Sequence, residues 1–116
     1  MTQSEARARV SKGALHLDQV RPGWAWQIDP GTLDLASQCF CVLGQLHGFY
    51  AKGLSQIPLN DDGNRLGWAY GFDITAYDYL GITEAGAAYR MLQDCWIEEI
   101  ANRLLPSSVE GQPAAV

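Results

Sequence analysis

One stretch in the middle of the chain, residues 41–50, constrains the fold more than any other. It is the longest apolar run, and its sequence is CVLGQLHGFY. Apolar residues recur at steps of three and four through it and beyond it, as Leu43, Leu46, Tyr50, Leu54 and Ile57. This spacing places them on one face of a helix, and a helix this apolar must be covered on more than one side. We therefore predict a buried central helix over residues 36–56, with Asp34 or Ser37 as its N-cap.

Two amphipathic helices are predicted near the ends of the chain. Over residues 4–20, small and apolar residues recur at helical spacing, as Ala6, Val10, Ala14 and Leu17. Residues 83–105 carry the clearest amphipathic pattern, with Thr83 as the N-cap and Pro106 directly after the predicted end. A short fourth helix is predicted over residues 73–80, between Asp73 and Gly81.

These elements predict an all-α fold, a small compact helical domain of about four helices with aromatic-rich connecting loops. A chain of 116 residues suits a single domain, and we place it at residues 1–106. Residues 107–116 are small and polar, which is typical of a disordered C-terminal tail.

Three glycines, Gly44, Gly48 and Gly53, lie within the predicted central helix. Gly44 and Gly48 lie four residues apart, and each interior glycine costs on the order of 1 kcal/mol relative to alanine. A stripe of small residues lets another backbone approach closely, so we predict close helix packing at Gly44 and Gly48. One alternative is that one of them breaks the helix. Another is a homodimer that uses this stripe or an exposed part of the Trp96 face.

Trp24 and Trp26 form the most distinctive short motif. Two residues at positions i and i+2 cannot share a face on a helix. One interpretation packs both rings over the core. The other leaves one ring exposed as a binding anchor, because tryptophan is enriched at interface hot spots. The sequence therefore names Trp24 and Trp26 as candidate partner-binding residues.

The charge is unevenly placed along the chain, which has a formal net charge of −5. Residues 1–21 carry four basic and two acidic side chains, whereas residues 22–116 carry four basic and eleven acidic ones. Affinity for nucleic acid depends on clustered lysines and arginines, so binding by the main body is disfavoured. The alternative function is a small DNA-binding regulator that uses the basic N-terminal helix or a degenerate helix-turn-helix at residues 73–90.

Candidate catalytic and metal-ligating residues are few. Side chains at i and i+2 of a helix point about 200° apart, so Cys39 and Cys41 cannot face one ion there. With Cys95 the cysteines are odd in number, which suits buried free thiols. His16 and His47, the two histidines, have no nucleophile motif beside them. We predict no enzyme activity, no catalytic residues, no cofactor and no metal site.

No segment reaches the roughly 20 apolar residues of a membrane span, and the polar N-terminus lacks the apolar region of a signal peptide. The sequence therefore predicts a cytoplasmic protein that does not interact with a membrane.

The chain resembles a group of small uncharacterised proteins from actinobacteria and their bacteriophages. The most specific shared block is Cys-Val-Leu-Gly-Gln-Leu at residues 41–46, followed by Gly48 and Tyr50. Further shared features are Pro22-Gly23-Trp24, Ile28-Asp29, Leu33-Asp34-Leu35, Gly53-Leu54 and Gly71-Phe72.

The resemblance covers most of residues 6–104. Members of the group often have Cys-x-x-Cys before Val-Leu-Gly. Here the spacing is Cys39-x-Cys41, so no thiol or metal role is carried over. The resemblance implies a phage or prophage accessory protein in the host cell cytosol, which binds a host protein and modulates a host process.

Overall fold

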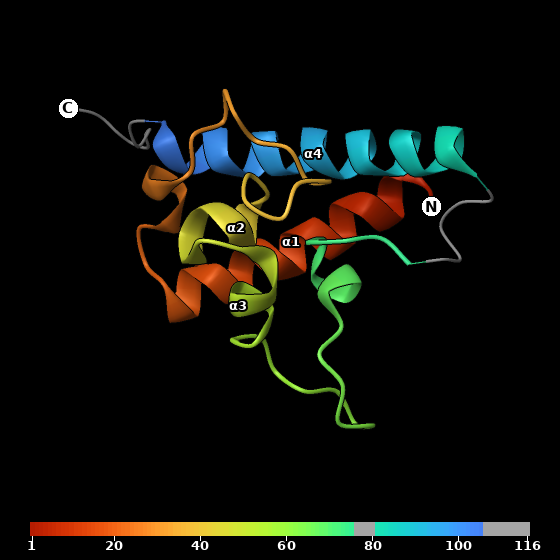
Figure 1. The fold of residues 1–116 in the computed structure, drawn as a ribbon. Helices are drawn as coiled ribbons and strands as arrows, with labels where there is room; N and C mark the ends of the chain where they lie inside the picture. Colours follow the sequence, from red (N-terminus) through yellow and green to blue (C-terminus); the bar gives the residue numbers. More distant parts are fainter. Residues whose placement is uncertain (76–80, 106–116) are drawn as a thin grey trace.

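Two long helices form the frame of the molecule, as shown by a computed structural model whose described residues are 1–75 and 81–105. Helix α1 (Gln3–Val20) crosses helix α4 (Ile82–Leu104), and the two contact each other along their apolar faces (Figure 1). The segment between them forms only short elements: η1 (Trp24–Gln27), α2 (Val42–His47), α3 (Tyr50–Leu54) and η2 (Gly67–Tyr70). The described part of the chain is helical and contains no strand, which confirms the predicted all-α class.

Helix α1 lies where the apolar spacing predicts it. A capping box fixes its start, because the Thr2 hydroxyl accepts from the Glu5 amide and the Glu5 carboxylate accepts from the Thr2 amide. The helix ends before Pro22, as the low helix propensity of a residue that precedes proline predicts. Its buried face consists of Ala6, Val10, Gly13, Ala14 and Leu17.

Helix α4 confirms the prediction for residues 83–105. Its buried positions follow the amphipathic pattern, as Ala88, Leu92, Cys95, Trp96 and Ile100. Only the predicted N-cap is wrong. The cap is Gly81, whose carbonyl accepts from the Ala85 amide, so the helix starts two residues earlier than a Thr83 cap requires.

Trp96 lies at the centre of the core and joins three parts of the chain. Its indole nitrogen donates to the Gly71 carbonyl at 2.7 Å. Its ring stacks on Phe72, with centroids 5.2 Å apart, and meets Trp24 edge to face at 5.6 Å. Aromatic pairs in these geometries stabilise by about 0.5–1.5 kcal/mol beyond the area that they bury. Trp96 therefore fastens η1 and the end of η2 to α4.

The closest backbone approach in the core is at Gly13 of α1. A Cβ atom at this position would lie 2.0 Å from the Tyr70 carbonyl oxygen and 3.0 Å from the Trp96 ring. Gly71 makes the reciprocal contact, since a Cβ there would lie 2.7 Å from the Val10 Cα. The backbones of α1 and of the end of η2 thus touch directly, which only glycine allows.

The predicted central helix over residues 36–56 is wrong. Residues 42–54 form two short helices, α2 and α3, which are separated by Gly48 and Phe49. Gly48 has a φ of 99°, a left-handed conformation that ends α2, and Phe49 is extended. The apolar spacing is real, but the backbone turns at the glycine before the pattern continues. The alternative in which a glycine breaks the helix is therefore confirmed.

The predicted N-caps of the central helix are also wrong. Cys41 caps α2, and its sulfur accepts from the Gly44 amide at 3.2 Å. Asp34 and Ser37 instead stabilise the turns that precede the helix. The Asp34 carboxylate accepts from the Ala36 amide, and the Ser37 hydroxyl accepts from two amides further along the same turn.

The expected helix crossing at Gly44 and Gly48 does not occur. A Cβ at Gly44 would lie 2.4 Å from the Gln38 carbonyl oxygen, so this glycine makes room for the preceding turn rather than for another helix. A Cβ at Gly48 would meet nothing within 4 Å. Its role is the positive φ alone.

Some predictions fall on residues that the structure does not describe. Of the predicted helix 73–80, residues 73–75 are not helical, and the remainder lies outside the described residues. The same gap interrupts the degenerate helix-turn-helix predicted at 73–90, and the predicted tail 107–116 also lies outside the described residues. None of the helices within 1–75 and 81–105 is long and apolar enough to cross a membrane.

Candidate functional site

The structure separates the two tryptophans that the sequence singles out. Both belong to the 3-10 turn η1, which places positions i and i+2 on different sides. Trp24 is 1% exposed, and its indole nitrogen donates to the Asp18 carboxylate at 2.9 Å. Trp26 is 72% exposed. Trp24 is thus part of the core, whereas Trp26 offers a large aromatic surface to a partner.

A charged network fixes the turn that carries Trp26. The Arg103 guanidinium donates to both oxygens of Asp18, at 2.7 and 2.9 Å, and also to Glu99. Its carbon lies 5.3 Å from the centre of the Trp24 ring. The bond from Arg103 lowers the pKa of Asp18, because it favours the ionised carboxylate. These contacts fix the backbone turn from which Trp26 projects.

An apolar groove lies at the C-terminal end of α4. It has a volume of about 300 Å³, and its lining residues are Pro30, Ile97, Ile100, Ala101, Leu104 and Leu105. Leu105 is 62% exposed. In Figure 1 the turn η1 lies near this same end of α4, which agrees with the contact between Arg103 and Trp24. Trp26 and the groove therefore belong to one end of the molecule.

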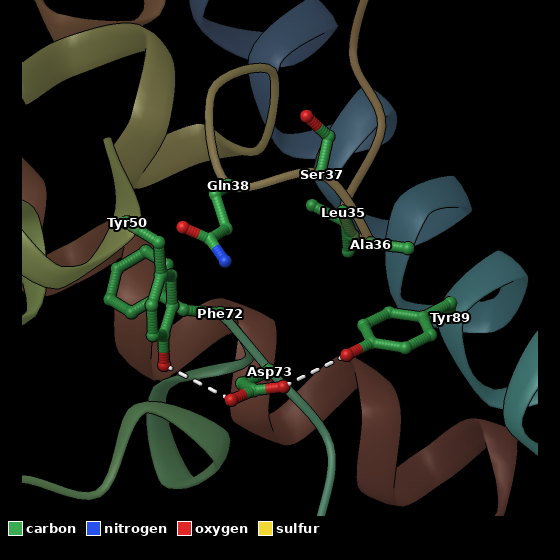
Figure 2. Close-up of a pocket in the computed structure, with 8 residues that line it drawn as sticks. All are labelled: Leu35, Ala36, Ser37, Gln38, Tyr50, Phe72, Asp73 and Tyr89. Carbon is green, nitrogen blue, oxygen red and sulfur yellow. Dashed lines mark hydrogen bonds between the residues drawn. The ribbon is translucent and has the colours of Figure 1, made fainter. Parts of the chain in front are cut away.

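A second site, which the sequence does not predict, surrounds Asp73 (Figure 2). Tyr50 at the start of α3 and Tyr89 in α4 point their hydroxyl groups toward this carboxylate from opposite sides. Tyr50 donates to Oδ2 at 3.2 Å and Tyr89 to Oδ1 at 3.0 Å. The pocket measures about 140 Å³ and is completed by Leu35, Ala36, Ser37, Gln38 and Phe72.

The electrostatics of this pocket are dominated by one carboxylate. Asp73 is partly buried, and its bonds come from the two phenols and from the Ile74 amide at 2.7 Å. Burial and then the charge of Asp73 raise the pKa of Tyr50 well above its ordinary value, so this phenol stays protonated and donates. All of these donors are neutral, which leaves the carboxylate without a cation in the described part of the chain.

A third cavity brings together both histidines. His16 of α1 and His47 of α2 line a space of about 230 Å³, together with Arg21. The Arg21 guanidinium lies 3.5 Å from Nδ1 of His47. Burial lowers the pKa of both imidazoles, and the charge of Arg21 lowers that of His47 further. Both rings are therefore neutral at neutral pH.

None of the three cysteines lines these cavities. Cys39 is exposed, Cys41 and Cys95 are buried, and all three thiols are free. Burial raises the pKa of Cys41 and Cys95, which disfavours the reactive thiolate. Among residues 1–75 and 81–105, no three histidine, cysteine or acidic side chains come close enough to hold a metal ion.

The basic side chains of the first helix are engaged within the protein. Arg7 forms an ion pair with Glu98 of α4. Arg9 and Lys12 lie over the aromatic rings of η2, at 5.1 Å from Trp68 and 4.8 Å from Tyr70. Arg21 follows the helix and donates to Gln27. These contacts direct the positive charges toward neighbouring elements of the same chain.

Periodicity could not reveal the Asp73 and histidine sites, because their members come from different elements. Tyr50 and Tyr89 follow the apolar face of a predicted helix, and Asp73 is a plausible helix cap. The only signal is that both tyrosines carry a hydroxyl which needs a partner when it is buried.

Comparison with known proteins finds no relative of this chain. The chain matches no protein-family model, and no curated protein and no solved structure is significantly similar to it. The candidate sites therefore rest on their own geometry.

Proposed function

We propose that the protein is a non-enzymatic protein-binding module and that Trp26 anchors its interface. The observation that carries this proposal is the 72% exposure of Trp26, on a turn that Trp24, Asp18 and Arg103 hold in place. Tryptophan dominates the binding free energy of many interfaces when a partner covers its ring. A turn whose backbone is already fixed also loses little conformational freedom on binding.

A second apolar surface lies at the same end of the molecule as η1, which carries Trp26. Leu105 and Ile97 are exposed by 62% and 38% at the end of α4 and line the groove described above. Scattered apolar side chains are normal on a protein surface, whereas apolar side chains gathered around a groove are typical of an interaction site.

The charge of the chain favours a basic partner. Residues 22–116 carry eleven acidic against four basic side chains. Complementary charge speeds association and selects among partners. We therefore propose a protein partner with an apolar pocket for Trp26 and basic residues around it. By its resemblance to phage proteins, the chain would act as an accessory protein that modulates a host process through this contact.

The test is an affinity capture with tagged protein from a host lysate, with and without nuclease. We expect one stoichiometric protein partner that resists nuclease and dissociates as salt is raised, because salt screens charge complementarity. Trp26→Ala should weaken the complex with the purified partner at least tenfold, a loss of about 1.4 kcal/mol or more.

A matched control tests whether the loss of any exposed apolar side chain weakens binding. Leu15→Ala also removes an exposed apolar side chain, 58% exposed, but from α1 rather than η1, and should leave binding unchanged. Both variants should unfold at the wild-type temperature. Equal binding by Trp26→Ala and wild type would contradict the proposal, and capture that depends on nucleic acid would favour the DNA-binding regulator instead.

A further inference from the structure

We propose that the pocket around Asp73 is a binding site for an organic ammonium group. The pocket lies along the first half of α4, at Tyr89, whereas Trp26 and the apolar groove lie near the end of that helix. It is therefore a separate site, and the proposal does not depend on the protein-binding function.

The first argument is the unbalanced charge. Asp73 is partly buried and faces the pocket, yet its hydrogen-bond donors in the described residues are two phenols and one amide. Removing a carboxylate from water has a free-energy cost that neutral donors offset only in part. A cation in the pocket would form charge-assisted hydrogen bonds with Asp73, which are stronger than neutral ones.

The second argument is the aromatic wall. The rings of Tyr50 and Tyr89 line the same small pocket as the carboxylate and stand on opposite sides of it (Figure 2), whereas Phe72, which also lines the pocket, is stacked on Trp96 and Tyr70. An ammonium group is attracted to the face of an aromatic ring within about 6 Å of its centre. Aromatic walls together with one carboxylate form the usual environment of bound alkylammonium groups.

The remaining lining residues match the rest of such a ligand. The Gln38 side chain lies across the pocket from Asp73 (Figure 2). Its amide group includes an oxygen that can accept from an ammonium N–H. Leu35 and Ala36 offer apolar surface for an alkyl chain. A volume of about 140 Å³ is well below that of a pocket for a drug-sized molecule, so it suits a head group with a short chain.

The donor set also distinguishes an organic cation from the other ions. Calcium takes six to eight oxygen ligands, commonly from several carboxylates, and magnesium requires near-octahedral oxygen coordination. This pocket supplies one carboxylate, and its phenols already donate to that carboxylate. The charge of Asp73 disfavours an anion. An ammonium group donates hydrogen bonds and is attracted to aromatic faces, so it can interact with both the carboxylate and the tyrosine rings.

The test is an NMR titration of the full chain with n-butylammonium chloride, followed through the backbone amides of Gln38 and Ile74. The neutral isostere 1-butanol is titrated in parallel at the same ionic strength. We expect n-butylammonium to bind at least tenfold more tightly than 1-butanol. Equal affinity for the two compounds would overturn the proposal, because it would show that the site binds the alkyl chain and does not recognise the positive charge.

Variants assign the binding to the pocket. Asp73→Asn should weaken n-butylammonium binding at least tenfold, whereas Asp61→Asn, which removes a charge from an exposed loop, should change it less than twofold. Because Asp73→Asn also alters two hydrogen bonds, a second variant leaves the carboxylate in place. Ala36→Leu fills the pocket from an exposed position and should abolish binding while the unfolding temperature stays unchanged. Unaltered binding by both variants would overturn the proposal.

Nα-acetyl-lysine methylamide distinguishes the sources of the ammonium group. Affinity equal to that of n-butylammonium would assign the pocket to a lysine side chain of a peptide. Affinity lower by tenfold or more would assign it to a free alkylamine. No binding of either cation at the Asp73 pocket would contradict the site altogether.

Discussion

The helix pair α1 and α4 and the segment between them, residues 21–75, are stabilised in different ways. The helices meet through side chains at helical spacing, such as Val10, Leu92 and Ile100. The connecting segment contains only helices of four to six residues. It also buries apolar side chains in the core, such as Leu35, Leu43 and Phe72, but turns, capping bonds and glycines fix the course of its backbone, which touches α1 where Gly13 and Gly71 allow close approach.

The difference shows where function can reside in so small a fold. The helix pair provides a rigid frame, and the candidate binding groups lie mainly in or beside the connecting segment. Trp26 belongs to it, as do Asp73 and Tyr50 of the ammonium pocket and His47 of the third cavity. Irregular segments can point side chains in directions that a regular helix cannot, while the frame keeps them in place.

The strongest test of this comparison is a pair of glycine substitutions in the two long helices. Gly13→Ala should lower the free energy of unfolding by about 3 kcal/mol, because the new Cβ would meet the Tyr70 carbonyl oxygen at 2.0 Å. Gly86→Ala should raise it by about 0.5–1 kcal/mol, because that position is exposed, helical and open within 4 Å. Chemical denaturation of both variants measures the two changes.

The opposite signs make this pair informative. Intrinsic helix propensity favours alanine at both positions, so the close contacts at Gly13, above all with the Tyr70 carbonyl of η2, distinguish them. A stabilising effect of Gly13→Ala would contradict the close approach of the connecting segment to α1.

The helix pair could be predicted from the sequence, and the connecting segment could not. In α1 and α4 the apolar spacing and the prolines that follow each helix indicate the same boundaries, although the predicted N-cap of α4 is wrong. Over residues 36–56 the same spacing predicts one helix, because periodicity reports which residues are buried and not whether the backbone is continuous. The decisive residue is Gly48, because a glycine can adopt either a helical or a left-handed backbone conformation.

A smaller effect is expected at Gly48, where the connecting segment departs from the predicted helix. Gly48→Ala should destabilise the protein by about 1–2 kcal/mol, because alanine has to adopt a φ of 99°. No steric clash contributes, since the space around this position is open within 4 Å. Chemical denaturation measures the change. A stabilised variant would instead indicate one continuous helix through residues 42–54, in which alanine is preferred to glycine.

The candidate sites were only partly predictable. For the pair Trp24 and Trp26, one exposed ring is only one of the two interpretations that the sequence allows, and the sequence does not show which ring it is, because a 3-10 turn, a helix and a strand orient them differently. The pocket around Asp73 and the cavity of His16 and His47 depend on contacts between distant elements. Such contacts follow from the packing of the connecting segment, which the periodicity does not encode.

The smallest effect is expected at the ion pair between the two long helices, whose carboxylate also binds the connecting segment through Trp24. Asp18 of α1 accepts from Arg103 of α4 and from Trp24 of η1. Asp18→Asn keeps an acceptor for Trp24 but removes the charge, and should lower the free energy of unfolding at pH 7 by less than about 1 kcal/mol, since the carboxylate is 41% exposed. Denaturation of the variant and of an Asp94→Asn control measures this loss.

The loss should depend on pH in one direction. The pKa of Asp18 is lowered in the folded protein from its ordinary value of 3.8, so its contribution is present above that value. The contribution disappears as the pH falls through the lowered pKa, because the protonated carboxyl no longer pairs with Arg103. Wild type and Asp18→Asn should therefore differ at pH 7 and converge in strong acid. A difference that persists there would show that Asp18 acts through its bond to Trp24, within the core, rather than through its charge.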